Sequence, residues 1–131
     1  MKVLVTGCAG FIGSHLVERL IEEGYDVIGI DCFSNYYSRR IKEGNISSFA
    51  DQIEFINENI LEMEINILDR VDYVFHLAAQ PGVRASWGKK FEIYTENNIL
   101  TTQRLLEGVK KYGVEKFVYA SSSSVYGNVN E

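Results

Sequence analysis

The sequence predicts a doubly wound parallel α/β sheet, and three observations support this fold class. Five short runs are nearly continuous in apolar residues, which is typical of strands buried on both faces of a parallel sheet. Helical segments with one apolar face alternate with these runs. A glycine-rich turn, TGCAGFIG, joins the first run to the first helical segment at residues 6–13. With right-handed crossovers, we expect one domain over residues 1–131, with about five strands in the order 3-2-1-4-5.

The expected strands cover residues 2–6, 26–31, 53–56, 73–77 and 116–121. A first helix is expected over residues 12–23, ending at Gly24, because charged residues occupy one face and apolar residues the other. Its apolar face comprises Ile12, Leu16, Val17, Leu20 and Ile21. Residues 39–50 are expected to form a second helix. A long third helix is expected over residues 91–112, ending at Gly113.

The buried stripe expected on the long helix contains a polar exception, Asn98. The stripe at helical spacing is Phe91, Tyr94, Asn98, Thr102, Leu105, Leu106 and Val109. A buried amide costs a few kcal/mol unless it is hydrogen-bonded. Spacing alone leaves two interpretations open: Asn98 ties the helix to the neighbouring strand ends, or it contacts a ligand.

The glycine turn has the pattern of a phosphate-binding turn. Gly7 permits the tight strand-to-helix turn, Gly10 lets the backbone approach a pyrophosphate, and Gly13 lets the helix pack closely on the sheet. The first amides of the helix, including those of Phe11 and Ile12, have no internal acceptor and lie at the positive end of the helix dipole. We therefore expect a dinucleotide site here.

Asp31 ends the second apolar run, at the distance of about twenty residues expected for a carboxylate that binds ribose hydroxyls. Its charge would repel a 2′-phosphate, and Cys32 and Phe33 supply no arginine to hold one. The sequence therefore favours NAD(H) over NADP(H). Cys8 and Cys32 follow neighbouring strands, so a disulfide is conceivable, but it would crowd the adenosine site, and we interpret both as free thiols.

Composition excludes several other classes of protein. The net charge is −5 and the 13 Lys and Arg residues are scattered among acids, so no basic patch for nucleic acid is expected. No apolar run approaches the length of a membrane span, and the chain enters a strand at once, so neither a membrane segment nor a signal peptide is expected. A cytoplasmic location is the default expectation. The cysteine spacing matches no metal motif.

The fourth and fifth runs end in FHLAAQPGVR and VYASSSSVYG. Small residues at these carboxyl ends, namely Ala78, Ala79, Ser121 and Ser122, leave room for a flat ligand beside the backbone. Four consecutive serines could also form a solvated turn. Their place at the ligand edge of the sheet favours a site.

Four stretches in this order, TGCAGFIGSHL, HLAAQPGVR, YTENNILTTQRLLE and FVYASSSSVYG, resemble the extended short-chain dehydrogenase/reductase family. They are most similar to its nucleotide-sugar 4-epimerases acting on UDP-glucose or UDP-glucuronate. The resemblance implies a Rossmann domain, NAD as cofactor, a UDP-sugar as substrate and a homodimeric enzyme.

The resemblance also implies residue roles. The pyrophosphate would be held by Gly7, Gly10, Phe11, Ile12 and Gly13. The rest of the cofactor would be bound by Asp31 and Asn35 (adenosine ribose or nearby phosphates), Asn59 and Ile60 (adenine), Leu77, Ala78 and Ala79 (nicotinamide ribose), Asn98 and Ser121. Asn59 replaces the carboxylate usual in the family. Ser122 matches the catalytic Ser or Thr, Ser123 and Ser124 would face the sugar, and Arg84 could meet a pyrophosphate or carboxylate, although Pro81 departs from the pattern of that loop.

The family's catalytic Tyr-x-x-x-Lys follows the serine turn on a helix, and residues 1–131 contain no such pair after Ser122. Tyr112 and Lys116 have the right spacing, but Gly113 interrupts the helix between them, and they precede the serines. We therefore expect the amino-terminal part of a longer epimerase, inactive alone. The alternatives are a sugar-nucleotide dehydratase or reductase of the family and a non-enzymatic dinucleotide-sensing module. Dehydratases of this kind usually carry Asp-Glu where Ser123 and Ser124 stand.

Overall fold

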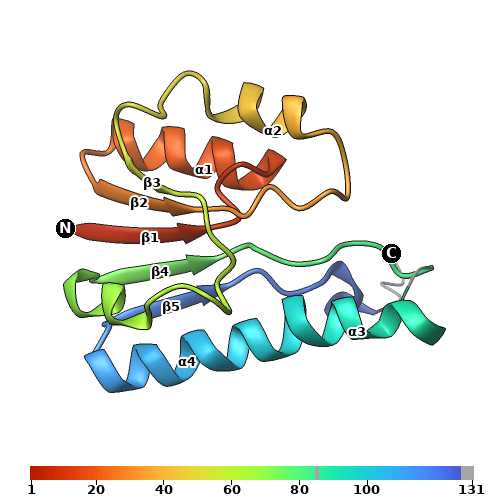
Figure 1. Ribbon diagram of the computed structural model, residues 1–131. Coiled ribbons are helices and arrows are strands. Elements are labelled where there is room, and N and C mark those ends of the chain that lie inside the picture. The colour runs from red at the N-terminus through yellow and green to blue at the C-terminus, as the bar shows by residue number, and fades with distance from the viewer. Residues whose placement is uncertain (85, 128–131) are drawn as a thin grey trace.

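The computed structural model describes residues 1–84 and 86–127, which form a five-stranded parallel sheet. Its order, β3-β2-β1-β4-β5, confirms the predicted topology. The strands point their carboxyl ends toward one edge (Figure 1). They are β1 (Lys2–Thr6), β2 (Asp26–Ile30), β3 (Glu54–Ile56), β4 (Tyr73–His76) and β5 (Lys116–Tyr119).

Helices cover the sheet on both sides (Figure 1). On one side lie α1 (Phe11–Glu22) and α2 (Arg39–Ile46). On the other side lie the 3-10 helix η1 (Ile65–Arg70) and a long composite helix. That helix comprises α3 (Phe91–Tyr94), the π-helical turn η3 (Thr95–Leu100) and α4 (Thr101–Tyr112). Two further 3-10 turns are η2 (Gly88–Lys90) and η4 (Ser123–Tyr126).

Two apolar clusters form the core, one on each face of the sheet, because successive strand residues point to opposite faces. Val3 and Val5 pack with Val17 of α1 on the first face. Leu4 and Val74 pack with Leu105 of α4 on the second. Both faces of the central strands are therefore buried, as their apolar runs predicted.

The prediction that Ile12 belongs to the buried face of α1 is wrong, because Ile12 is 68% exposed. The buried positions are instead Gly13, Ser14, Val17 and Leu20. A Cβ atom added to Gly13 would lie 2.1 Å from the carbonyl oxygen of Gly7, so the first turn of α1 is pressed against the glycine turn. That contact turns Ile12 away from the core and toward the carboxyl edge of the sheet.

The long helix ends at Gly113, in the left-handed conformation predicted for that residue (φ 72°). Tyr94 and Leu105 of the expected stripe are buried, but Phe91 and Leu106 are exposed, and Thr101 and Gly108 are buried in addition. The lack of a side chain on Gly108 lets α4 approach Leu68 and Ile65 of η1 closely, which directs Leu106 to solvent. Phe91 is the first residue of α3, the part of the long helix that extends past the carboxyl ends of the strands (Figure 1).

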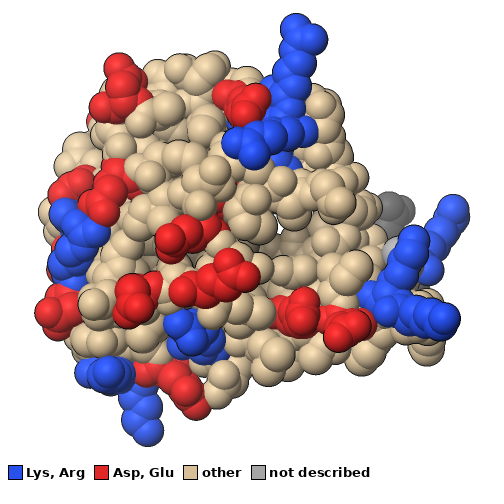
Figure 2. All heavy atoms as spheres, viewed as in Figure 1, with Lys and Arg blue, Asp and Glu red and all other residues tan. Residues whose placement is uncertain are grey.

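Among the described residues, no helix is both long and apolar enough to cross a bilayer. Lys and Arg side chains are interspersed with Asp and Glu on the face that Figure 2 shows, and that face is hollowed at the carboxyl edge of the sheet.

The short helix expected over residues 39–50 ends earlier than predicted, at Ile46, and turns follow.

Candidate functional site

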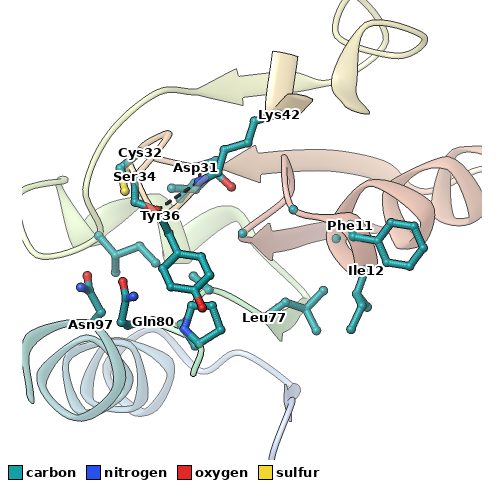
Figure 3. Close-up of a pocket in the computed structure, with 18 of the residues that line it drawn as sticks. Phe11, Ile12, Asp31, Cys32, Ser34, Tyr36, Lys42, Leu77, Gln80 and Asn97 are labelled. Carbon is teal, nitrogen blue, oxygen red and sulfur yellow. Dashed lines mark hydrogen bonds and ion pairs between the residues drawn. The ribbon is translucent and has the colours of Figure 1, made fainter. Parts of the chain in front are cut away.

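A pocket of about 500 Å³ lies at the carboxyl edge of the sheet. Segments that follow β1, β2, β3 and β4 line it, together with α2 and the middle of the long helix. Figure 3 shows Asp31 and Lys42 at one end of this pocket and Phe11 and Ile12 at the other. This is the switch point of a doubly wound sheet, where ligands bind in such folds.

The glycine turn forms one wall of the pocket and depends on the absence of side chains. Gly7 has a φ of +72°, and a Cβ atom there would lie 2.9 Å from the backbone nitrogen of Ala78. Gly10 caps α1 without a side-chain hydrogen bond, and the first turn contains no acidic residue. The amide of Ser14 is the first that donates to a helical carbonyl, that of Gly10, at 2.9 Å. The first three amides of α1, those of Phe11, Ile12 and Gly13, are therefore available to an anion in the pocket.

The carboxylate of Asp31 is held in place by backbone amides on both sides. Its Oδ2 accepts a hydrogen bond from the amide of Ala9 at 3.2 Å, and its Oδ1 accepts one from the amide of Phe33 at 2.8 Å. A carboxylate has about four lone-pair sites, so acceptor capacity remains for a ribose diol. Asp31 is 9% exposed and lines the pocket. These contacts leave Asp31 able to accept hydrogen bonds from the adenosine ribose that the sequence predicts here.

Lys42 lies beside Asp31, and the sequence analysis missed it. Its side chain is buried, its Nζ donates to the hydroxyl of Ser34 at 3.1 Å, and the same nitrogen lies 3.9 Å from Oδ1 of Asp31. Burial, and then the negative charge of Asp31, raise the pKa of the neighbouring Tyr37. Lys42 precedes the buried Ile46 by one helical turn, so helical periodicity over α2 was the signal that could have placed it at the core.

Most of the residues expected to bind a cofactor come together around this pocket. It is lined by Gly7, Gly10, Phe11, Ile12, Gly13, Asp31, Asn59, Ile60, Leu77, Ala78 and Ala79. Asn35, Asn98 and Ser121 do not line it, whereas their sequence neighbours Ser34, Asn97 and Ala120 do. A one-residue step changes the direction of a side chain in any of these elements, and sequence motifs do not determine that direction.

The side chain of Asn98 is paired with the backbone after β4. Its Oδ1 accepts from the amide of Gln80 at 2.7 Å, and its Nδ2 donates to the carbonyl of Gln80 at 3.1 Å. Of the two interpretations that spacing left open, this geometry matches the tie between the helix and the strand end. The tie holds the loop after β4 against the pocket.

The expected catalytic and substrate residues lie outside the pocket lining. Ser122, Ser123 and Ser124 are exposed at the start of η4, and the hydroxyl of Ser122 accepts from the amide of Ser124 at 3.2 Å. Arg84 is exposed in the loop after β4. The pocket therefore brings together the expected cofactor residues but not these four.

Tyr112 and Lys116 do not form a pair. Tyr112 ends α4 and packs at the second core cluster, whereas Nζ of Lys116 lies 5.7 Å from the ring centre of Tyr73. The sequence-based rejection of this pair as a catalytic motif agrees with that geometry.

Cys8 is buried and Cys32 exposed, and both are free thiols, as predicted. Burial, and then the charge of Asp31, raise the pKa of Cys8 to about 12. Within residues 1–84 and 86–127, no cluster of His, Cys, Asp and Glu side chains is arranged to hold a metal ion.

Residues 3–131 match the family model described as the NAD dependent epimerase/dehydratase family. An uncharacterized UDP-glucose epimerase, YtcB, of Bacillus subtilis (strain 168) is 47% identical over 131 residues, which cover 97% of this chain and 42% of that protein. The crystal structure of UDP-glucuronic acid 4-epimerase from Bacillus cereus, in complex with UDP-glucuronic acid and NAD, has a TM-score of 0.92 and 48% identity. That similarity covers 100% of this chain and 43% of the other.

UDP-glucose 4-epimerase from Thermotoga maritima, solved with UDP-glucose, has a TM-score of 0.78 and 37% identity, over 100% of this chain and 41% of its own. The chain thus spans about two fifths of the length of the relatives that it matches.

Proposed function

Because the chain belongs to the NAD dependent epimerase/dehydratase family, we propose that its pocket binds NAD as part of a nucleotide-sugar 4-epimerase. One observation carries the proposal: an uncapped helix N-terminus and a buried carboxylate face the same pocket. The first suits a diphosphate and the second a ribose diol. A dinucleotide contains both groups.

NAD, when bound, supplies reversible hydride transfer at C4 of the sugar. The role of this chain's residues is to bind and orient. The amides that begin α1 would hold the pyrophosphate, and Asp31 would fix the adenosine ribose. Ala78 and Ala79 have small side chains, and both line the pocket, which leaves space for a ring beside the end of β4.

Ser122 is the residue of this chain that we propose for the sugar. Its hydroxyl would hydrogen-bond the O4 atom as the proton leaves it, with Ser123 and Ser124 beside the sugar. No Tyr-x-x-x-Lys follows Ser122 within residues 1–131, so we expect these residues alone to bind NAD without epimerising a sugar. A UDP-sugar as substrate and a homodimer as the assembly of the complete enzyme belong to the same proposal.

The binding part of the proposal is tested by calorimetric titration of the protein with NAD. We expect heat of binding that ADP-ribose abolishes by competition, because the adenosine and diphosphate contacts carry the interaction. A folded sample with no affinity for NAD would overturn the proposal.

The catalytic part is tested on the full-length gene product with UDP-glucose and UDP-glucuronate, following inversion at C4. We expect Ser122→Ala to lower kcat about 100-fold while NAD affinity is unchanged, since loss of one proton-handling hydroxyl has an effect of this order. Ser47→Ala, which removes an exposed serine after α2, is the matched control. No inversion of either sugar by the unmodified enzyme would exclude a 4-epimerase for these substrates.

A further inference from the structure

Lys42 has fewer partners than a buried ammonium group ordinarily requires. It is 5% exposed, yet the structure gives it one hydrogen bond, to the hydroxyl of Ser34 at 3.1 Å. Its distance of 3.9 Å from Oδ1 of Asp31 is too long for a hydrogen bond, and the ring centre of Tyr37 lies 4.9 Å away. An ammonium group has three donors, and Lys42 lines the pocket. A polar group in the pocket could therefore be recognised here.

Asp31 lies among donors that all suit an anion. The amides of Ala9 and Phe33 donate to its two oxygens, and the ammonium of Lys42 stands behind one of them. Removal of the carboxylate would leave two backbone donors, a hydroxyl and a cation facing one space. Figure 3 shows the side chains of Asp31, Ser34 and Lys42 converging there.

We propose that Ser34, Lys42 and the amides of Ala9 and Phe33 form an anion site that the carboxylate of Asp31 fills. When that carboxylate is removed, the site takes the 2′-phosphate of NADP. This inference rests on the proposed NAD function. Asp31 is then the group that excludes NADP, since the cation that a 2′-phosphate needs is already in place.

The cation beside Asp31 comes from a part of the chain that the local sequence around Asp31 does not reveal. The residues directly after Asp31 contain no cation, but α2 brings one to it from further along the chain. Arg39 and Arg40 also begin α2, but both are exposed and neither lines the pocket. Arg39 is bonded to Glu43 at 2.8 Å, so Lys42 is the cation of α2 that faces the pocket.

The test is a double-mutant cycle read by calorimetric Kd values for NAD and NADP. We expect Asp31→Ser to tighten NADP binding at least about tenfold, because a phosphate replaces a repelling carboxylate among charge-assisted donors. Lys42→Met in the Asp31→Ser background should abolish that gain. Lys110→Met, which removes an exposed lysine of α4, should leave the gain intact.

A second test keeps Asp31 unsubstituted. In the otherwise unmodified protein, Lys42→Met should raise the ratio of the NADP Kd to the NAD Kd about tenfold, because the carboxylate then repels the 2′-phosphate without a neighbouring cation. Circular dichroism and thermal melting establish that each variant is folded. Lack of NAD binding by the unmodified protein would overturn the proposed function. Normal NAD binding, with no NADP gain in Asp31→Ser or a gain that survives Lys42→Met, would overturn the anion site alone.

Discussion

Protonation of His76 should destabilise the fold, because a directed hydrogen-bond network keeps this side chain neutral. Oγ1 of Thr6 accepts from the amides of Leu77 and Ala78, so its own proton goes to Nδ1 of His76, at 2.7 Å. The other ring nitrogen, Nε2, then donates to the hydroxyl of Thr102 at 2.9 Å. A second proton on the ring would point at an oxygen whose lone pairs are already used.

The size of the effect follows from the pKa of His76, which burial lowers from 6.5 to about 4. As the pH falls below 6.5, the unfolded chain binds a proton that the native state does not, so the free energy of unfolding decreases. Each pH unit between those two pKa values removes about 1.4 kcal/mol, and the whole window removes about 3 kcal/mol. This is a large share of the ~5–15 kcal/mol stability of a typical domain.

Urea denaturation between about pH 7 and about pH 4.5 measures this loss. His76→Gln keeps an amide donor and acceptor but does not titrate, so it should be less stable at neutral pH and lose less stability on acidification. Carboxylates titrate in both proteins, so the difference between the two slopes isolates His76. His15→Gln, at the other histidine, which is exposed on α1, controls for the loss of a histidine as such. Parallel slopes for His76→Gln and the unmodified protein would refute the reasoning.

Three further predictions test the glycine turn, the thiols and the outer strand. Gly13→Ala should abolish NAD binding and lower the free energy of unfolding by several kcal/mol, because its Cβ would lie 2.1 Å from a carbonyl oxygen. Gly44→Ala in α2 has open space and should raise the free energy of unfolding by about 0.5–1 kcal/mol in urea denaturation. Similar effects of the two substitutions would contradict this reasoning. An aromatic disulfide reagent should label Cys32 in the native protein and Cys8 only after unfolding, and NAD should slow the labelling of Cys32. Labelling of Cys8 in the native protein would count against its burial. Val118 is 41% exposed on β5, which pairs only with β4 among the described residues. Sedimentation should therefore detect self-association, which Val118→Lys should weaken. A strictly monomeric unmodified chain at high concentration would exclude this self-association.

The strands and the glycine turn were predictable because their signals are local. Apolar runs identify strands buried on both faces, and Gly7 and Gly13 stand where a side chain would collide with backbone. The faces of the helices were less predictable. Ile12 and Leu106 are apolar but exposed, since close contacts of Gly13 and Gly108 decide how each helix is turned against its neighbours.

The residues of the site also differ in how far the sequence could predict them. Asp31 could be assigned from its distance along the chain to the glycine turn. Helical periodicity could indicate only that Lys42 is buried, because its place beside Asp31 depends on how α2 packs over the sheet edge. The two interpretations of Asn98 were likewise separated only by its pairing with Gln80.

The sequence by itself determined the strand order, the glycine turn and the acid that faces it. The glycine motif after the first strand indicates the dinucleotide-binding topology, and its residues have strict backbone or burial requirements. Only the tertiary structure decided which side chains of α1, α2 and the long helix reach the pocket. The direction of a helical side chain changes by about 100° with each residue, and packing against distant elements sets that rotation.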